Sequence, residues 1–361
     1  MIRRWTVLIS CVAFVLHGGA SALSAAQSAQ TAPASQGAKE PTRLAIHVNP
    51  LVDMHYYFRA LAEQRDEAAI PEPFRGAVAA LRTFYSVTGP QVGSAMIEPV
   101  MMTCATAAEL HDAVDKFPGR IQRRDGAPVP SRAPCRELSR AYMDVEQAFR
   151  TDIWPAHAKA IEAAQASLDR TLLPRADECL RFVLTSLAML DPGIEIPVTL
   201  VAEAPFPQGF TYRRRNAGPA CFVGVQDLEG SLLSEVVLHE AIHALDVATD
   251  GQPTVPVQLF EKLLAAGNRR GGPAHRDVPH TLIFVQAAET IRRVVDPAHQ
   301  DYGDVRGYYA KVPEAVAAVR ERWRECLDGK LPREQAVADI ASAYKPPQTA
   351  SSPATSAPHE P

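Results

Sequence analysis

Two histidines four residues apart, with a glutamate directly after the first, form the most chemically informative motif of the sequence. His239, Glu240 and His243 stand in the run His-Glu-Ala-Ile-His. Residues four apart lie on one face of an α-helix, so both imidazoles can approach one metal ion at the ~2.0–2.1 Å typical of a zinc–nitrogen bond. Glu240 is offset around the helix axis, where it can take a proton from a water that the metal activates. The spacing predicts two metal ligands and a general base within one helical turn.

The residues around this motif predict a largely buried helix over 232–247. Buried imidazoles and carboxylates need partners, because an unpaired buried polar group costs several kcal/mol. A shared metal ion would satisfy them. The alternative is that both histidines only form hydrogen bonds on an ordinary helix. The apolar residues that indicate burial are Val236, Val237, Leu238, Ile242 and Leu245.

The motif resembles that of the HExxH zinc metallopeptidases, the zincins. The resemblance covers residues 196–295, and only the HExxH core is sharp. It implies a strand that precedes and flanks the motif helix, one Zn²⁺ per chain, and a peptide or protein substrate hydrolysed with Glu240 as general base. The metzincin extension HExxHxxGxxH is missing, since the chain continues Ala-Leu-Asp-Val-Ala-Thr with neither the glycine nor the third histidine.

A third ligand is expected from a second helix. In the gluzincin branch of the family a glutamate supplies it, and the resemblance implies Glu289, in the run Gln-Ala-Ala-Glu-Thr. His280 is the rival ligand and also a candidate oxyanion donor. The two positions are nine residues apart, roughly half a turn out of phase, so one continuous helix should bring only one of them to the metal. A Glu289 outside the site would pair with Arg292 or Arg293.

Two acidic residues are candidates for orienting the ligands. Asp246 lies one turn after His243, where a carboxylate can accept the other ring N–H of a ligating histidine and fix its tautomer. Alternatively, Asp246 is a solvated acid at the helix end. Glu235, one turn before His239, invites the same argument.

Tyrosines beyond the second helix are candidates for stabilising a developing oxyanion. Tyr308 and Tyr309 follow the glycine-containing turn 304–307, and Tyr302 precedes it. Adjacent tyrosines also commonly pack in cores, which is the alternative role for this pair.

The elements around the motif predict an α+β fold that is predominantly helical, with a zincin-like metal-binding lobe over 191–345 that includes a small flanking sheet. Strands are expected at 196–201 and 220–225, with a loop or ribbon over 205–219. A loop rich in Gly, Arg and Pro is expected at 266–279. Further helices are expected at 280–295, 313–327 and 332–344.

The N-terminal half predicts a helical lobe over 42–190, with a substrate cleft between it and the metal-binding lobe. Apolar residues recur at helical spacing in 71–85, 137–168 and 175–190. Pro155 predicts a break in the second of these, because a proline clashes with the preceding helical turn.

The two ends of the chain have compositions unlike the rest. Residues 1–26 predict a signal peptide, since two arginines precede an apolar run and small residues follow it. The run is shorter than the ~20 residues of a membrane span, so secretion or export to a periplasm is expected, with no stable membrane insertion. Residues 27–41 and 346–361 are rich in Ala, Gln, Ser and Pro, and predict a flexible linker and a disordered tail.

Charge and cysteine content narrow the classes of function. The formal net charge of −4 becomes −6 when Arg3 and Arg4 leave with the signal peptide. Such a chain is not expected to bind nucleic acid, which requires concentrated Lys and Arg. The five cysteines outside the predicted signal peptide form no CxxC pair. Their spacing argues against cysteine-ligated zinc. One or two disulfides are expected in an oxidising compartment.

The sequence therefore predicts an exported zinc-dependent metallohydrolase, foremost a peptidase. One alternative is a zinc hydrolase that acts on a non-peptide amide or ester. Another is a non-catalytic cell-envelope binding protein with a vestigial or structural metal site. A structural site would normally have four protein ligands and would not need Glu240 as a base.

Overall fold

The structure is a computed structural model that describes residues 40–345, except 65, 123–125, 206–207, 215–217, 250–251 and 269–271. The predicted signal peptide, all but the last two residues of the predicted linker, and the predicted tail lie outside the described residues. Within the described part, no helix combines the length and apolar composition that crossing a membrane requires.

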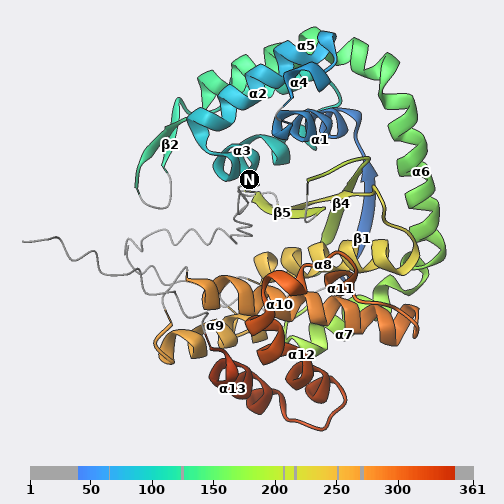
Figure 1. The fold of residues 1–361 in the computed structure, drawn as a ribbon, viewed down its shortest axis with the longest axis vertical. Helices are drawn as coiled ribbons and strands as arrows, with labels where there is room; N and C mark the ends of the chain where they lie inside the picture. The colour runs from blue at the N-terminus through green and yellow to red at the C-terminus, as the bar shows by residue number, and fades with distance from the viewer. Residues whose placement is uncertain are drawn as a thin grey trace, which may run out of the picture.

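A four-stranded sheet lies at the centre of an α+β fold that is predominantly helical, as predicted (Figure 1). The strand order is β1-β4-β6-β5, in which β1, β4 and β6 run parallel and β5 pairs antiparallel with β6. The strands are β1 (Arg43–Val48), β4 (Glu195–Val201), β5 (Gly209–Arg214) and β6 (Gly218–Gly224). The order leaves β5 at one edge of the sheet.

Alternating side chains of the sheet supply two separate cores. Successive residues of a strand face opposite sides, and in β6 Cys221 and Val223 join the lower core of Figure 1 while Ala220 and Phe222 join the upper one. The buried strands β4 and β6 thus read as nearly continuous apolar runs, which is the pattern of a sheet covered on both faces.

The upper core is formed by helices inserted between the neighbouring parallel strands β1 and β4. Figure 1 shows α1, α2, α4 and α5 above the sheet, with the small hairpin of β2 (Arg120–Gln122) and β3 (Pro128–Pro130) at one side. The helices of this layer are α1 (Pro50–Glu63), α2 (Arg75–Thr88), α3 (Pro90–Met101), α4 (Ala107–Val114) and α5 (Arg132–Asp152).

Helix α6 (Trp154–Arg170) connects the two layers and runs down one side of the molecule in Figure 1. It begins directly after α5 ends, with Pro155 in its first turn, so the predicted break is confirmed. A proline has no N–H to donate and is tolerated in that first turn. The buried residues of α6 and of α7 (Ala176–Ser186) belong to the lower core.

The lower core packs around α8, the helix that carries the histidine motif. Helix α8 lies against β4, β5 and β6, and α10 packs on its other side. The helices of this layer are α8 (Gly230–Ala248), α9 (Val255–Ala265), α10 (Pro273–Thr290), α11 (Tyr302–Val305), α12 (Pro313–Leu327) and α13 (Arg333–Ala343). The predicted helices at 232–247, 313–327 and 332–344 are confirmed within two residues.

Two sequence predictions about the elements differ from the structure, and it decides a third. Residues 43–48 form strand β1, and 120–122 and 128–130 form the small hairpin, although 42–190 read as helical. Residues 209–214 form strand β5 and pair with β6, so the ribbon alternative for 205–219 describes the structure. Helix α10 begins at Pro273 and contains Pro279, although a loop was expected up to 279. A proline at the first helical position is favoured, because the missing N–H has no partner there in any case.

The expected disulfides are not formed. No disulfide joins the cysteines of the described residues, which lie in separate elements of the two cores or their connections. Cys104, Cys135, Cys179 and Cys221 are buried, and Cys326 is half-buried.

A buried ionic network supports β5 from the upper side. The Glu98 carboxylate accepts hydrogen bonds from Arg59 Nη1 at 2.7 Å and from the Tyr56 hydroxyl at 2.6 Å. The Arg59 guanidinium also lies 5.0 Å from the ring centre of Phe210 on β5. Burial alone would raise the pKa of Glu98, but the charge of Arg59 and the hydrogen bond from His55 lower it to about 2. The upper helices thus hold the edge strand through a charged pair.

We expect Glu98→Ala to destabilise the fold by about 3 kcal/mol, because it leaves the Arg59 charge without its buried partner. Glu178→Ala is the matched control, since Glu178 pairs with Arg175 at the surface, where such pairs contribute about 0–1 kcal/mol. Urea unfolding followed by circular dichroism measures both. Equal effects would contradict the assignment of Glu98 as a structural anchor.

Candidate metal centre

Helix α8 presents His239 and His243 on one face, as their spacing predicts. The Nε2 atoms of the two rings lie 3.1 Å apart. His239 is buried and His243 is half-buried. Two nitrogens bound tetrahedrally at ~2.0–2.1 Å from zinc would lie about 3.3–3.4 Å apart, so the observed separation is close to that of a shared metal.

Helix α10 brings a third imidazole to the same point. His280 Nε2 lies 3.2 Å from His239 Nε2. Possible ligand atoms of His239, His243 and His280 all lie within 4.8 Å of one another. Two nitrogens from one helix and one from its neighbour therefore converge from two directions.

The three imidazoles have the protonation that metal binding requires. Burial lowers the pKa of His239 well below its usual value, and the nearby His243 and His280 lower it further. Burial also lowers the pKa of His243 to about 4 and that of His280 well below the usual range. Neutral imidazoles keep a lone pair for a metal, and three of them with an open fourth position make a known catalytic zinc arrangement. The residues present fit Zn²⁺.

Two aromatic side chains hold the ligands in place. The ring centre of Phe284, one turn after His280 on α10, lies 4.0 Å from that of His239. The Tyr308 hydroxyl lies 3.0 Å from His280 Nδ1, on the side of the ring away from the cluster. A partner at Nδ1 leaves Nε2 as the ligand atom and fixes the tautomer. Tyr308, predicted as an oxyanion donor, here contacts a candidate ligand.

The Glu240 carboxylate lies beside the cluster and does not join it. Its Oε1 is 4.0 Å from His239 Nε2. Burial raises the pKa of Glu240 to about 8, although a hydrogen bond from Thr211 opposes the shift. A cation between the imidazoles would lower that pKa, since a nearby opposite charge favours the carboxylate. Glu240 thus lies next to the histidine cluster and outside it, and its predicted role as a base stays a prediction.

Strand β5 fixes the position of this carboxylate. The Thr211 hydroxyl donates to Glu240 Oε2 at 2.6 Å. A Cβ atom at Gly209 would lie only 2.3 Å from Glu240 Oε1, so a side chain there would displace the carboxylate. Residues 209 and 211 face α8 together because strand side chains alternate.

A small cavity lies next to the cluster. Its volume is about 10 Å³, which is about the space that one water molecule needs. It is lined by Glu235, Val236, His239, Glu240, His280, Phe284 and Tyr302. The cavity thus connects the predicted base and two of the histidines with Tyr302.

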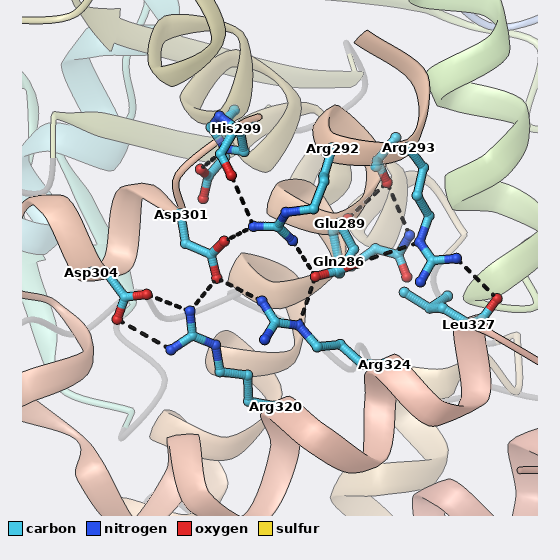
Figure 2. A network of polar contacts seen from close by, with 12 residues as sticks. Gln286, Glu289, Arg292, Arg293, His299, Asp301, Asp304, Arg320, Arg324 and Leu327 are labelled. Atoms are coloured by element: carbon cyan, nitrogen blue, oxygen red, sulfur yellow. Dashed lines mark hydrogen bonds and ion pairs between the residues drawn. The ribbon is translucent and has the colours of Figure 1, made fainter. Parts of the chain in front are cut away.

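Glu289, predicted as the third ligand, belongs to a different site. Figure 2 shows its carboxylate among arginine side chains, and its Oε1 accepts hydrogen bonds from Arg292 and, at 2.7 Å, from Arg324 Nε. Arg293 Nε lies 3.4 Å from the other oxygen. His280 occupies the place expected of Glu289, because nine residues of a continuous helix put the two side chains on opposite faces. The alternative pairing with Arg292 and Arg293 describes the structure correctly.

The other predicted residues lie around the centre. The Tyr302 hydroxyl donates to Gln208 Oε1 at 3.1 Å. Tyr309 packs closely on Gly303 and under Arg320, and its buried hydroxyl has no partner among the described residues. Asp246 is half-buried one turn after His243, and its predicted contact with that histidine stays a prediction.

Sequence reasoning missed the residues that surround the ligands from other elements. Thr211 and Gly209 come from a segment read as loop or ribbon, and nothing in their local pattern points to Glu240. Phe284 had a signal, because it follows His280 by four residues and therefore shares its helical face. That signal could be used only once His280 was known to lie beside His239 and His243.

Comparisons with protein families, with curated proteins and with solved structures each found no match for this chain.

We expect the purified, never-chelated protein to contain about one zinc per chain, measured by elemental mass spectrometry. His239→Ala and His280→Ala should lose it, because two imidazoles hold the ion much less tightly than three. Glu289→Ala should keep it, since that carboxylate contacts arginines.

Circular dichroism of each variant checks that the fold persists. Retention of zinc by His280→Ala together with its loss from Glu289→Ala would contradict the assignment of the third ligand.

Proposed function

We propose that the protein is a zinc-dependent hydrolase of the HExxH type that cleaves peptide bonds. The observation that carries the proposal is the convergence of His239, His243 and His280, with the Glu240 carboxylate 4.0 Å from the nearest of their Nε2 atoms. The resemblance to the zincins supports the reaction type. The third ligand proposed here is a histidine, so the chain departs from the gluzincin pattern at that position.

When bound, zinc supplies a Lewis acid that polarises a carbonyl and makes a water acidic enough to ionise near neutral pH. The three imidazoles would hold the ion, and three protein ligands would leave a coordination position for substrate or water. Glu240 would take the proton from the attacking water and return it to the leaving amine, which is the role of a general base that becomes a general acid. Thr211 keeps one Glu240 oxygen in place while the other faces the reaction.

The edge strand next to Glu240 supports a peptide substrate. In the described sheet, β5 pairs with β6 on one side only. An extended peptide can add to such an edge by main-chain hydrogen bonds. Because Gly209 and Thr211 of the same strand contact Glu240, a peptide paired there would pass beside the base.

Export is part of the proposal and rests on the N-terminal sequence, which has the order of a signal peptide. If the protein is exported, its substrate lies outside the cytoplasm. Profiling with a peptide library beside a panel of amides and esters separates a peptidase from another zinc hydrolase. Turnover of esters or non-peptide amides without turnover of any peptide would favour a zinc hydrolase that is not a peptidase.

Glu240→Gln is expected to lower kcat by about 10²–10⁴-fold while the zinc content stays at the wild-type level, because the amide cannot accept the proton. Peptide hydrolysis and elemental analysis are measured on the same preparation. Wild-type turnover by this variant would exclude Glu240 as the base.

Gly209→Ala is expected to retain zinc and lose activity, up to about 10²-fold, because its Cβ would displace the Glu240 carboxylate. Gly76→Ala is the matched control, since a Cβ at Gly76 meets nothing within 4 Å. Full activity in Gly209→Ala would show that the contact between β5 and Glu240 does not position the base.

A further inference from the structure

Glu235 is a buried carboxylate that the proposed reaction does not use. It lies on α8 one turn before His239 and is fully buried. Its Oε2 atom accepts two hydrogen bonds, from the Tyr302 backbone N–H at 2.7 Å and from His299 Nε2 at 2.6 Å. Its Oε1 atom has no partner among the described residues. Leaving a buried carboxylate oxygen unpaired costs a large part of its hydration free energy.

His239 also has a buried polar atom without a hydrogen-bond partner among the described residues. Its Nε2 atom faces His243 and His280 at the metal centre. Its Nδ1 atom is buried and also has no partner among the described residues. Histidines that bind metal almost always donate their other ring N–H to a carboxylate, a carbonyl or a water.

Glu235 and His239 both line the cavity beside the cluster. Side chains four apart share a helical face and lean toward the N-terminus of the helix, so the ring of His239 lies over the turn that carries Glu235. Both residues line the cavity and His243 does not, which puts the cavity on the Glu235 side of His239. Its volume of about 10 Å³ suits one water molecule.

We propose that Glu235 positions His239 for metal binding through one buried water, which accepts from His239 Nδ1–H and donates to Glu235 Oε1. The inference rests on the proposed zinc function. The link would fix the His239 tautomer with Nε2 toward the metal and would make the imidazole a better ligand. Glu235 acts through His239 and is a positioning residue.

The arginine network of Figure 2 gives Glu235 a fixed position. Arg292 Nη2 donates to the backbone oxygen of His299 at 3.2 Å and also pairs with Asp301. Arg320 donates to the other Asp301 oxygen at 2.7 Å. These contacts hold the segment 299–302 against α8, and its His299 side chain and Tyr302 N–H are the groups that bind Glu235. The contacts that hold this segment are made to His299 and Asp301, and none of them involves the Glu289 carboxylate.

The test compares Glu235→Gln with Glu289→Gln, a second buried carboxylate of the same core that contacts none of the three histidines. Zinc affinity is measured by competition with a chromophoric chelator, and thermal unfolding confirms that each variant folds. Glu235→Gln is expected to bind zinc about 10–100-fold more weakly than wild type. Glu289→Gln is expected to bind it unchanged.

A high-resolution crystal structure of the zinc-loaded wild type provides the second measurement. It should show one water within about 3 Å of both Glu235 Oε1 and His239 Nδ1. If Glu235→Gln does not fold, the presence or absence of this water in the wild-type structure tests the link between Glu235 and His239. Unchanged zinc affinity in a folded Glu235→Gln, or a wild-type structure with no water at this position, overturns the inference and leaves the zinc function standing. A wild type that binds no zinc overturns the proposed function itself, and the inference with it.

Discussion

Three neutral imidazole nitrogens meet at one buried point, and the rest of the structure is organised around keeping them there. Burial makes protonation of His239 and His280 unfavourable, and each additional positive charge would repel the next. Neutral rings keep lone pairs that a cation can share, and the Nε2 atoms lie 3.1 and 3.2 Å apart, which is also a distance for hydrogen bonds between the rings. Two helices must pack against each other to bring the rings together, and α8 and α10 do so. The metal centre and the packing of these helices thus depend on each other.

The central sheet connects this point to the other half of the molecule. On its lower side β5 holds the Glu240 carboxylate through Thr211 and the absence of a side chain at Gly209. On its upper side Phe210 of the same strand lies under the Arg59 guanidinium, whose partner is Glu98. A charged pair in one core therefore supports the strand that contacts the Glu240 carboxylate in the other. The unpaired edge of β5 lies between the two layers, where we propose that substrate binds.

The sequence predicted the elements with strong local signals. The motif helix, the two buried strands and the break at Pro155 could be read from spacing and residue type, and so could the pairing of His239 with His243. The third ligand could not. His280 and Glu289 are both plausible ligands, and choosing between them requires the rotation of α10 about its axis, which packing against α8 and α12 sets. Arg292 and Arg293 gave a local hint that Glu289 was already paired, but Arg324 comes from another helix and no local pattern connects it to Glu289. Strand β1 was missed because it becomes a strand only by pairing with β4, which is distant in sequence. Strand β5 pairs with the neighbouring β6, and the sequence left open whether its segment was a loop or a ribbon.

The most direct measurement is an anomalous difference map from crystals of the never-chelated protein, recorded on both sides of the zinc absorption edge. We expect one strong zinc peak about 2.0–2.1 Å from the Nε2 atoms of His239, His243 and His280, with no fourth protein ligand. A peak bound by the Glu289 carboxylate, a site closed by a fourth side chain, or no peak among the three histidines would contradict it.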